Sequence, residues 1–399
     1  MNVQLSVAAM LLLFLPPQRG PETPVSAHTD KQERSAVIGS IHMSDREEAG
    51  LRGPVRTCVQ ETIFPNRESV LTTTTEYSLD GKLLAVRFGN PDGSGWVTTH
   101  TYNAEGRLAK TTSGKSGESG VETLYAYDDA GRSLSIKNSQ NGDRTDFHYD
   151  EQGAKRAIQR FDPKTLQRAQ NSAYGGSAWN AAFAGFGVPV GGSVTTIYDE
   201  NDRPVEAQIR DAEDHLVSRV LRTYNTAGLI SEERPMLDDP TSMFLDRLPA
   251  EEWAQLNPAQ VQAIKRGLST LLGGKAQRGT LHTYDAQNRV TNVRESTFVF
   301  QKTTTIIYND QGDRAEEHTS FTANSAVPIG VPFSVNEDGT LTPSNPAAGV
   351  PTVPDLPRES EVRYAYQYDD YGNWTQQAGK DSFNSDSPST VRRRKLTYC

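Results

Sequence analysis

Runs of β-branched and aromatic residues recur along most of this chain, and polar residues alternate with them. Residues 53–61 alternate in this way and would place Val55, Thr57 and Val59 on one face. Such residue types suit a pleated, half-buried surface, so the pattern predicts β-strands. The most pronounced further runs are residues 72–75, 303–307 and 364–368.

One segment has a helical period instead. Within residues 235–279, apolar residues recur from Val261 to Leu272 with the spacing of one helical face. Pro258 precedes them as a proline at a first helical position, and Gly273 follows them as a stop signal. The segment predicts two short helices inserted into a β protein.

Between the strands, the chain repeats a turn sequence whose clearest copy is residues 127–132, Tyr-Asp-Asp-Ala-Gly-Arg. The tyrosine would end a strand, and the carboxylate of Asp128 can accept the backbone N–H two residues later. Gly131 would take the positive φ that returns the chain antiparallel with a bulge. In two copies Asp202 and Asn288 replace the glycine, and both residue types tolerate this conformation. The hexapeptide predicts the tip of a β-hairpin.

Nine such turns lie along the chain. Neighbouring tyrosines are usually 22 to 26 residues apart, which is room for two strands and two turns. The tyrosines and glycines predicted to hold the repeat together are Tyr77 and Gly81, Tyr102 and Gly106, Tyr127 and Gly131, Tyr149 and Gly153, Tyr198, Tyr224 and Gly228, Tyr284, Tyr308 and Gly312, and Tyr368 and Gly372.

Three steps between tyrosines are longer, because segments of about 163–193, 235–279 and 322–358 are inserted. Each insertion falls between a returning strand and the next outgoing strand. In an antiparallel meander the tyrosine turns would therefore line one rim, and the insertions would emerge from the other. We predict a mainly β fold in which repeated antiparallel hairpins form one curved, coiling sheet with a small helical insertion.

Aromatic residues make the first insertion a candidate binding site. Tyr174, Trp179, Phe183 and Phe186 lie in a stretch rich in glycine and alanine. Such side chains can stack on a sugar or contact a protein, and the alternative is a loop that folds them over the open end of the sheet. The third insertion is rich in proline, which predicts an extended loop.

The net charge of the chain bears on whether its partner is a nucleic acid. The 399 residues carry a net charge of −9, which argues against nucleic acid as the main partner. Residues 392–395 are the one dense basic run, and we interpret them as a solvated face of the last strand.

The N-terminus has the pattern of an export signal. Residues 5–15 form an apolar run too short to span a bilayer, and residues 25–27 resemble a cleavage site. We predict a signal peptide over 1–27, a poorly ordered lead-in over 28–50 and the repeat domain over 51–399. The alternative is a buried N-terminal strand. The mature chain would have no membrane span and would lie in the periplasm, on the cell surface or outside the cell.

The chain has two cysteines, Cys58 and Cys399, near the two ends of the repeat domain. Export would permit a disulfide between them. Two unpaired thiols are the alternative.

Motifs of common catalytic chemistry are absent from the sequence. The 7 histidines show no zinc spacing, and there is neither a nucleophile elbow nor a phosphate loop. His100 and His282 each stand two residues before a repeat tyrosine, which suggests a structural role. We predict no catalytic residue, no metal and no cofactor.

The repeated Tyr-Asp-x-x-Gly-Arg, from Thr74 to the end of the chain, resembles the YD repeats of RHS-type proteins. The resemblance implies a long β-hairpin sheet that coils on itself at or beyond the cell surface, and it implies sugar binding by the repeats. Large members of the family enclose toxins. Nine turns would be too few to close a shell around a cargo, so we expect neither encapsulation nor toxin delivery.

Three functions are consistent with these features. The first is an exported, non-enzymatic protein that binds a protein partner or a glycan through the insertion rim. The second is a structural envelope protein, or an accessory component of an RHS system, that associates with itself. The third is an enzyme whose site is built from the insertions.

Overall fold

The structure, a computed structural model, describes part of the chain. The described residues are 3–5, 44–65, 69–89, 95–140, 142–160, 192–238, 258, 261–262, 279–296, 300–323, 333–335, 341–343, 359–382 and 388–399. They belong to two compact units, which we describe separately. Unit 1 comprises Met1–Val37, Tyr149–Thr303 and Ser320–Arg358, and unit 2 comprises Ile38–His148, Thr304–Thr319 and Glu359–Cys399.

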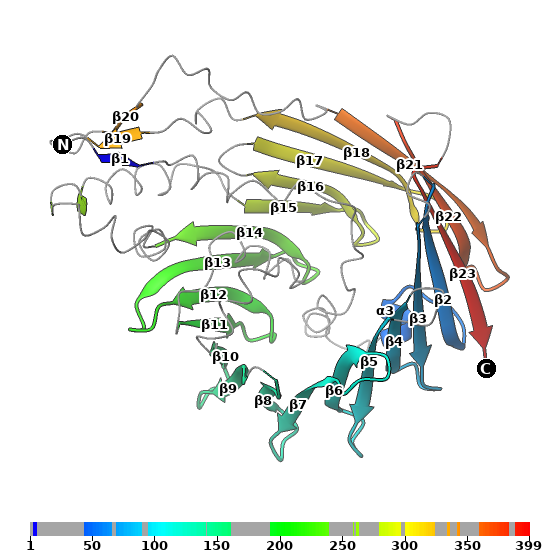
Figure 1. The fold of residues 1–399 in the computed structure, drawn as a ribbon, viewed down its shortest axis with the longest axis horizontal. Coiled ribbons are helices and arrows are strands. Elements are labelled where there is room, and N and C mark those ends of the chain that lie inside the picture. The colour runs from blue at the N-terminus through cyan, green and yellow to red at the C-terminus, as the bar shows by residue number, and fades with distance from the viewer. Residues whose placement is uncertain are drawn as a thin grey trace. The chain divides into compact units, whose positions relative to one another are not determined.

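Unit 2 contains one helical turn and a run of antiparallel strands (Figure 1). These are α3 (Asp45–Glu48), β2 (Val55–Phe64), β3 (Ser69–Tyr77), β4 (Leu83–Gly89), β5 (Gly95–Tyr102), β6 (Leu108–Lys115), β7 (Val121–Tyr127), β8 (Ser133–Asn138), β9 (Arg144–Tyr149), β21 (Glu359–Tyr368), β22 (Trp374–Asp381) and β23 (Thr390–Tyr398). The buried residues Leu51, Val55, Cys58, Tyr77, Leu83 and Val86 form its core cluster.

Unit 1 contains a second run of strands and a small separate sheet. The run is β10 (Lys155–Arg160), β11 (Ser193–Tyr198), β12 (Pro204–Arg210), β13 (Leu216–Tyr224), β14 (Ile230–Leu237), β15 (Gly279–Tyr284) and β16 (Val290–Ser296), and the small sheet is β1 (Val3–Leu5), β19 (Phe333–Val335) and β20 (Leu341–Pro343). The two units share β17 (Phe300–Tyr308) and β18 (Arg314–Ala323). Ala207, Ile209, Val217 and Val220 are almost completely buried.

The sheet closes on itself, and the predicted coiling sheet is therefore wrong. The first long strand, β2, pairs with β3 on one side and with β23 on the other, with Cys58 opposite Leu396. Through this pairing and that of β18 with β21, strands β2 to β18 and β21 to β23 form a closed antiparallel barrel. Closure gives every strand two neighbours and so removes the unpaired edges of an open sheet. Nine turns are enough to close it.

The turns have the conformation that the sequence predicts. The backbone φ is positive at Gly81, Gly106, Gly131, Gly153, Gly228, Gly312 and Gly372, and also at Asp202 and Asn288. The strand register shifts at the tyrosine itself, as between Ala126 and Tyr127, which is the predicted bulge. The turn between β12 and β13 lacks the tyrosine but has the same backbone hydrogen bonds, and Asp214 in it has a positive φ.

The alternation predicted for residues 53–61 is interrupted. A register shift between Val55 and Thr57 inserts an extra residue into β2. As a result Val55 and Cys58 both face the core cluster, whereas Val59 is only partly buried. The sequence pattern therefore missed Cys58 as a core residue.

The last residues of the predicted lead-in are structured. Ser44 caps α3, and it and Glu47 form a reciprocal capping box. The backbone N–H of Arg46 donates to Gly81 O at 3.0 Å, and Asp45 Oδ2 accepts from the N–H of Leu83 at 2.6 Å. These bonds hold residues 44–50 against the turn between β3 and β4.

The remaining predictions for the insertions and the N-terminus are tested only in part. Within the third insertion, β19 and β20 pair with each other, and β19 also pairs with β1 inside the predicted signal peptide. These short strands replace part of the extended loop expected there. Nearly all of the predicted helical insertion lies outside the described residues. The export signal stays a prediction.

Candidate functional site

The candidate binding residues of the first insertion lie outside the described residues. Tyr174, Trp179, Phe183 and Phe186 are all in this position. The connectivity of the described strands bears on that insertion indirectly. The first insertion joins the end of β10 to the start of β11, and Tyr198 lies at the opposite end of β11.

The polar groups of the repeat turns bind within the repeat itself. Asp128 Oδ1 accepts from the backbone N–H of Arg132 at 2.7 Å, and Asp128 Oδ2 accepts from Arg132 Nε at 2.8 Å. These hydrogen bonds lower the pKa of Asp128. The backbone N–H of Gly131 donates to Asp128 O at 2.8 Å. Hydrogen bonds between residues of the turn itself therefore stabilise it.

The arginine of one turn also contacts the tyrosine of the next repeat. The Arg203 guanidinium lies 4.6 Å from the centroid of the Tyr224 ring, and Arg203 is ion-paired to Asp199 of its own turn. Arg107 lies over Tyr127 in the same way, at 5.6 Å. The hydroxyls of Tyr102, Tyr127, Tyr224 and Tyr284 each donate to a backbone carbonyl of the preceding repeat, as from Tyr127 to Leu108 O at 2.8 Å. The motif residues therefore hold neighbouring repeats together.

The last two turns lack the arginine and use other partners. Asp313 stands in its place in one turn, where the Tyr368 hydroxyl donates to Asp313 Oδ2 at 2.9 Å. Asn373 stands there in the other, and its Nδ2 donates to the Tyr398 hydroxyl at 2.9 Å. Arg52, which follows α3, donates its backbone N–H to Asn373 Oδ1 at 2.7 Å. The N-terminal segment thus completes the turn layer beside the β2–β23 pairing.

A cavity of about 610 Å³ lies beside this segment in unit 2. Polar groups of Arg46, Glu47, Arg52 and Asp313 line it. Arg52 is engaged there by two carbonyl oxygens, those of Gly372 at 3.2 Å and Gln311 at 3.0 Å. The cavity lies where the segment bridges two turns that are far apart in sequence.

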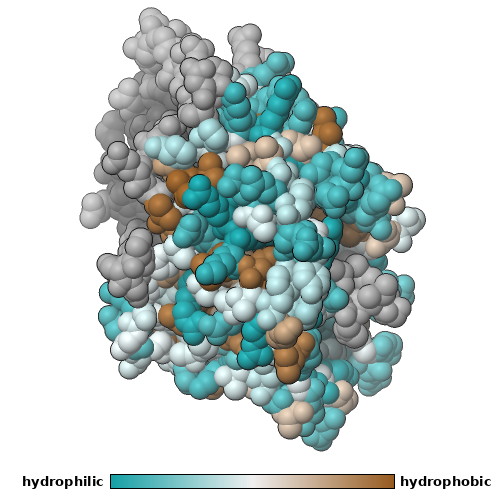
Figure 2. Space-filling model, turned by 90° about the vertical axis from the view of Figure 1, so that its right-hand side faces the viewer, coloured by the Kyte–Doolittle hydropathy of each residue, from teal (hydrophilic) through white to brown (hydrophobic). Residues whose placement is uncertain are grey.

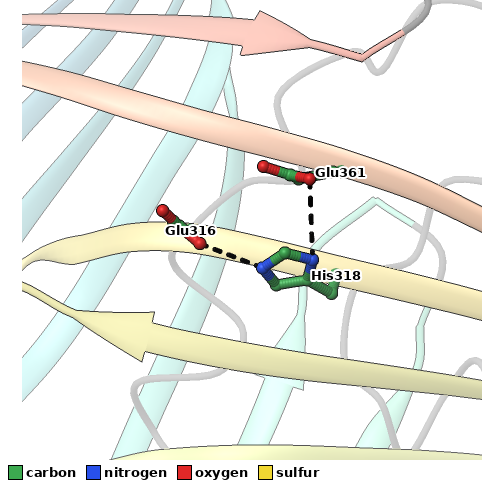
Figure 3. Close-up of side chains that lie close together, drawn as sticks. All are labelled: Glu316, His318 and Glu361. Carbon is green, nitrogen blue, oxygen red and sulfur yellow. Dashed lines mark hydrogen bonds and ion pairs between the residues drawn. The ribbon is translucent and has the colours of Figure 1, made fainter.

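Three neighbouring side chains in unit 2 are of types that could together bind a metal ion (Figure 3). Glu316 and His318 project from β18 and Glu361 from β21, and their ligand atoms lie within 4.8 Å of one another. His318 Nε2 lies 3.0 Å from Glu316 Oε2, and His318 Nδ1 lies 3.9 Å from Glu361 Oε2. The sequence did not reveal this group, because β18 and β21 are joined by a long insertion.

The guanidinium of Arg363 already forms ion pairs with both carboxylates of this group. Arg363 Nε lies 3.7 Å from Glu316 Oε1, and Arg363 also donates to Glu361. Both ring nitrogens of His318 face carboxylates as well. These contacts explain why the three side chains lie together, because they form a network of ion pairs across neighbouring strands. A bound cation would have to displace Arg363 from the carboxylates.

Unit 1 holds a buried charged pair. Arg222 Nε donates to Glu233 Oε1 at 2.7 Å, and the two side chains are 2% and 12% exposed. Burial lowers the pKa of the nearby His282, and the charges of Glu233 and Glu295 oppose this shift. The group lies on the strand face that carries the repeat tyrosines, which we call the tyrosine face.

A different surface lies on the tyrosine face of unit 2. It consists of Tyr366 on β21, Trp374 and Gln377 on β22, and Arg392 and Arg394 on β23, and we call it the arginine–aromatic surface. The Arg394 guanidinium lies 3.5 Å from the centroid of the Trp374 ring, and the rings of Tyr366 and Trp374 meet edge to face at 6.5 Å. All five residues are partly exposed.

Amide side chains position the two arginines. Arg392 Nη1 donates to Gln377 Oε1 at 3.0 Å, and Arg394 Nε donates to Gln60 Oε1 at 3.1 Å. Gln377 Nε2 in turn donates to the Tyr366 hydroxyl at 2.8 Å. Among the described residues neither guanidinium forms an ion pair with a carboxylate. Burial lowers the pKa of Arg394.

The basic run is thus not the uniform solvated face predicted for it. Arg393 and Lys395 are exposed, whereas Arg392 and Arg394 are partly buried on the opposite face. Strand alternation is the reason, because residues two apart share a face. The sequence contained the information for this, since Arg392 and Arg394 are each an even number of residues from Tyr398 on the same strand and so share its face.

The two cysteines are free thiols, one buried and one exposed. Cys58 faces Leu396 across the β2–β23 pair, and Cys399 is three residues further along. That offset is about 10 Å at the rise of a strand, which exceeds the Cα separation of about 7 Å that a disulfide tolerates. The bridge considered from the sequence does not form in this register.

Figure 2 shows one face of the molecule, on which hydrophobic side chains are separated by hydrophilic ones. Large apolar side chains that are exposed among the described residues include Leu79, Trp96 and Leu124. None of the described helices is both long and apolar enough to cross a membrane.

Comparisons with known proteins assign no family. No family model matches the chain, and no curated protein matches it. Among solved structures, it is similar to TcdB2-TccC3 without the hypervariable C-terminal region, with 13% identity, a TM-score of 0.32, and coverage of 81% of this chain and 14% of that chain. A Photorhabdus luminescens Tc holotoxin pore has 11% identity, a TM-score of 0.27, and coverage of 82% and 16%.

A porin-like protein from Bacteroides uniformis is similar over 87% of this chain and 98% of that chain, with 10% identity and a TM-score of 0.27. The chain therefore spans a small part of the Tc toxin components and nearly all of the porin-like protein. At these scores the similarities carry no functional argument. The RHS resemblance stays one of repeated motifs, accompanied by structural neighbours among Tc toxin components.

Proposed function

We propose that this chain is an exported, non-enzymatic binding module for a protein or glycan partner. The repeat turns serve as its scaffold, because their aspartate, arginine and tyrosine side chains bind one another. The arginine–aromatic surface is different, since its aromatic, amide and guanidinium groups stand partly exposed beside one another. This combination offers ring faces, hydrogen-bond donors and positive charge to a ligand. It is the observation on which the proposal rests.

The first insertion is a second contact surface in this proposal. Its aromatic residues, Trp179 and Phe186 among them, belong to a segment that leaves β10 at the strand end away from the tyrosine turns. Loops carried by a rigid sheet are common sites of recognition.

Binding by the purified full chain tests the proposal. The chain would be screened on a glycan array and against proteins extracted from the cell surface, and each ligand found would be titrated against variants. We expect Trp374→Ala to weaken binding at least about tenfold, the effect of losing a charge-linked contact. Trp96→Ala is the control, because Trp96 is an exposed tryptophan on another strand of unit 2.

The results separate the alternatives. A ligand whose binding falls with Trp179→Ala and Phe186→Ala, and not with Trp374→Ala, would assign the site to the insertion. A chain that binds no ligand and sediments as an oligomer would overturn the proposal in favour of a structural role.

A further inference from the structure

We infer that Arg392 and Arg394, the arginine pair, form an anion-binding subsite that takes an extended acidic peptide segment of a protein partner. The inference rests on the proposed function and narrows it to one class of partner. Both arginines project from β23 onto the tyrosine face, next to Trp374 and Gln377.

Unmatched charge is the first argument. A guanidinium has five N–H donors, and among the described residues each of these two makes one hydrogen bond. Partly buried arginines usually face a carboxylate, because burial of an unpaired charge is unfavourable. In unit 1 the partly buried Arg203 is paired in this way with Asp199, and the buried Arg222 with Glu233. In a chain with a net charge of −9, two adjacent arginines without such a partner indicate a ligand that brings the negative charge.

Spacing is the second argument, and it selects the class of ligand. The arginines are two residues apart on one strand, so their Cα atoms are separated by about 7 Å. An extended peptide places its alternate side chains at the same interval. Carboxylates on alternate residues of such a peptide would each meet one guanidinium, with the bidentate geometry that arginine and carboxylate favour.

The neighbouring groups fit a peptide as well. Gln377 and Gln60 hold the two guanidiniums by one nitrogen each and leave the remaining donors available. Trp374 and Tyr366 lie beside the pair, where they offer apolar surface to the residues between the carboxylates. Arg393, the residue between the two arginines, is exposed on the opposite face of the strand and would not contact such a peptide.

Fluorescence anisotropy with labelled probes tests the inference on the full chain. One peptide alternates glutamate and threonine, and its matched control alternates glutamine and threonine. We expect the glutamate peptide to bind at least about tenfold more tightly, with affinity that falls as sodium chloride rises to about 0.5 M. Equal binding of the two peptides would overturn the anion subsite. An oligogalacturonate is the third probe, and its binding at the pair without that of the peptide would overturn the choice of a peptide.

Variants on one strand locate the subsite. R392Q with R394Q should abolish the preference for the glutamate peptide, whereas R393Q with K395Q places the same charge loss on the opposite face and should leave it unchanged. The first variant should also unfold at a temperature close to that of the wild type, because neither arginine forms an ion pair with a described carboxylate. If both variants lose binding equally, or no probe binds while a partner is still found for the chain, the subsite falls and the proposed function stands.

Discussion

The phenol hydroxyl of Tyr224 donates a 2.7 Å hydrogen bond to the carbonyl oxygen of Pro204. Pro204 is buried at the start of β12, one repeat before the tyrosine. Burial raises the pKa of Tyr224 to about 12, so the hydroxyl remains a donor throughout the neutral range. The same contact recurs from Tyr102 to Leu83 O, from Tyr127 to Leu108 O and from Tyr284 to Ile230 O.

Removal of this hydroxyl should destabilise the fold. Tyr224→Phe leaves the buried carbonyl of Pro204 without its donor, and an unsatisfied buried group of this kind costs about 1–3 kcal/mol. Urea unfolding followed by circular dichroism measures the change. Tyr371→Phe is the control, since Tyr371 is 51% exposed and its hydroxyl makes no hydrogen bond with described residues. Equal losses in the two variants would contradict a specific role for the Tyr224 hydroxyl.

Two turn glycines separate backbone strain from contact loss. At both Gly131 and Gly153 φ is positive, and an alanine there costs about 1–2 kcal/mol. A Cβ at Gly131 would lie 2.0 Å from Arg107 Nη2, whereas a Cβ at Gly153 would meet nothing within 4 Å. Gly131→Ala should therefore destabilise by about 0.5–1 kcal/mol more than Gly153→Ala, because it displaces Arg107 from the Tyr127 ring. Chemical unfolding of both variants gives the difference, and a larger loss at Gly153 would refute the contact.

Adjacent glutamates on β14 should differ strongly in their effect. Glu233→Ala removes the 2.7 Å ion pair of Arg222, whose side chain is only 2% exposed, and the loss of this buried pair costs on the order of 3–5 kcal/mol. Glu232→Ala removes an ion pair with Arg234, whose side chain is 56% exposed, and should cost less than about 1 kcal/mol. Thermal and urea unfolding would rank the two variants. A mild effect of Glu233→Ala would mean that water reaches Arg222.

The turns could be predicted from the sequence because their requirements are local. A positive φ restricts the residue at one position to glycine, aspartate or asparagine, so Gly131, Asp202 and Asn288 marked their turns directly. The bulge at each tyrosine follows from the same local geometry. The interior position of Cys58 did not follow, because one extra residue in β2 reverses the alternation.

Closure and the arginine–aromatic surface depend on contacts between distant residues. Val55 pairs with Tyr398, and no local pattern in either strand specifies that partner. Arg394 acquires its setting from Gln60 and Trp374, which lie on two other strands. Strand alternation alone places Arg394 on the tyrosine face. That Arg394 forms no ion pair with a described carboxylate follows only from the structure.

Acid should weaken the turn of residues 127–132. Hydrogen bonds from Arg132 lower the folded-state pKa of Asp128 below its unfolded value of about 3.9. A lowered pKa means that the contribution of this carboxylate to stability is present above about pH 4 and is lost as the pH falls through the folded pKa. Unfolding of the wild type and Asp128→Asn across this range should show a difference that disappears on acidification. Asp129→Asn is the control, because Asp129 is exposed in the same turn and should show no such difference.

The two thiols should differ in reactivity. Burial raises the pKa of the Cys58 thiol, and the residue is 6% exposed, so its reactive thiolate is both scarce and shielded. Cys399 is exposed. Iodoacetamide at neutral pH should therefore alkylate Cys399 in the native chain and spare Cys58, and it should label both after unfolding in urea, as read by peptide mass spectrometry. Labelling that requires prior reduction would reveal a disulfide, and the β2–β23 register would then have to shift to bring the two cysteines together.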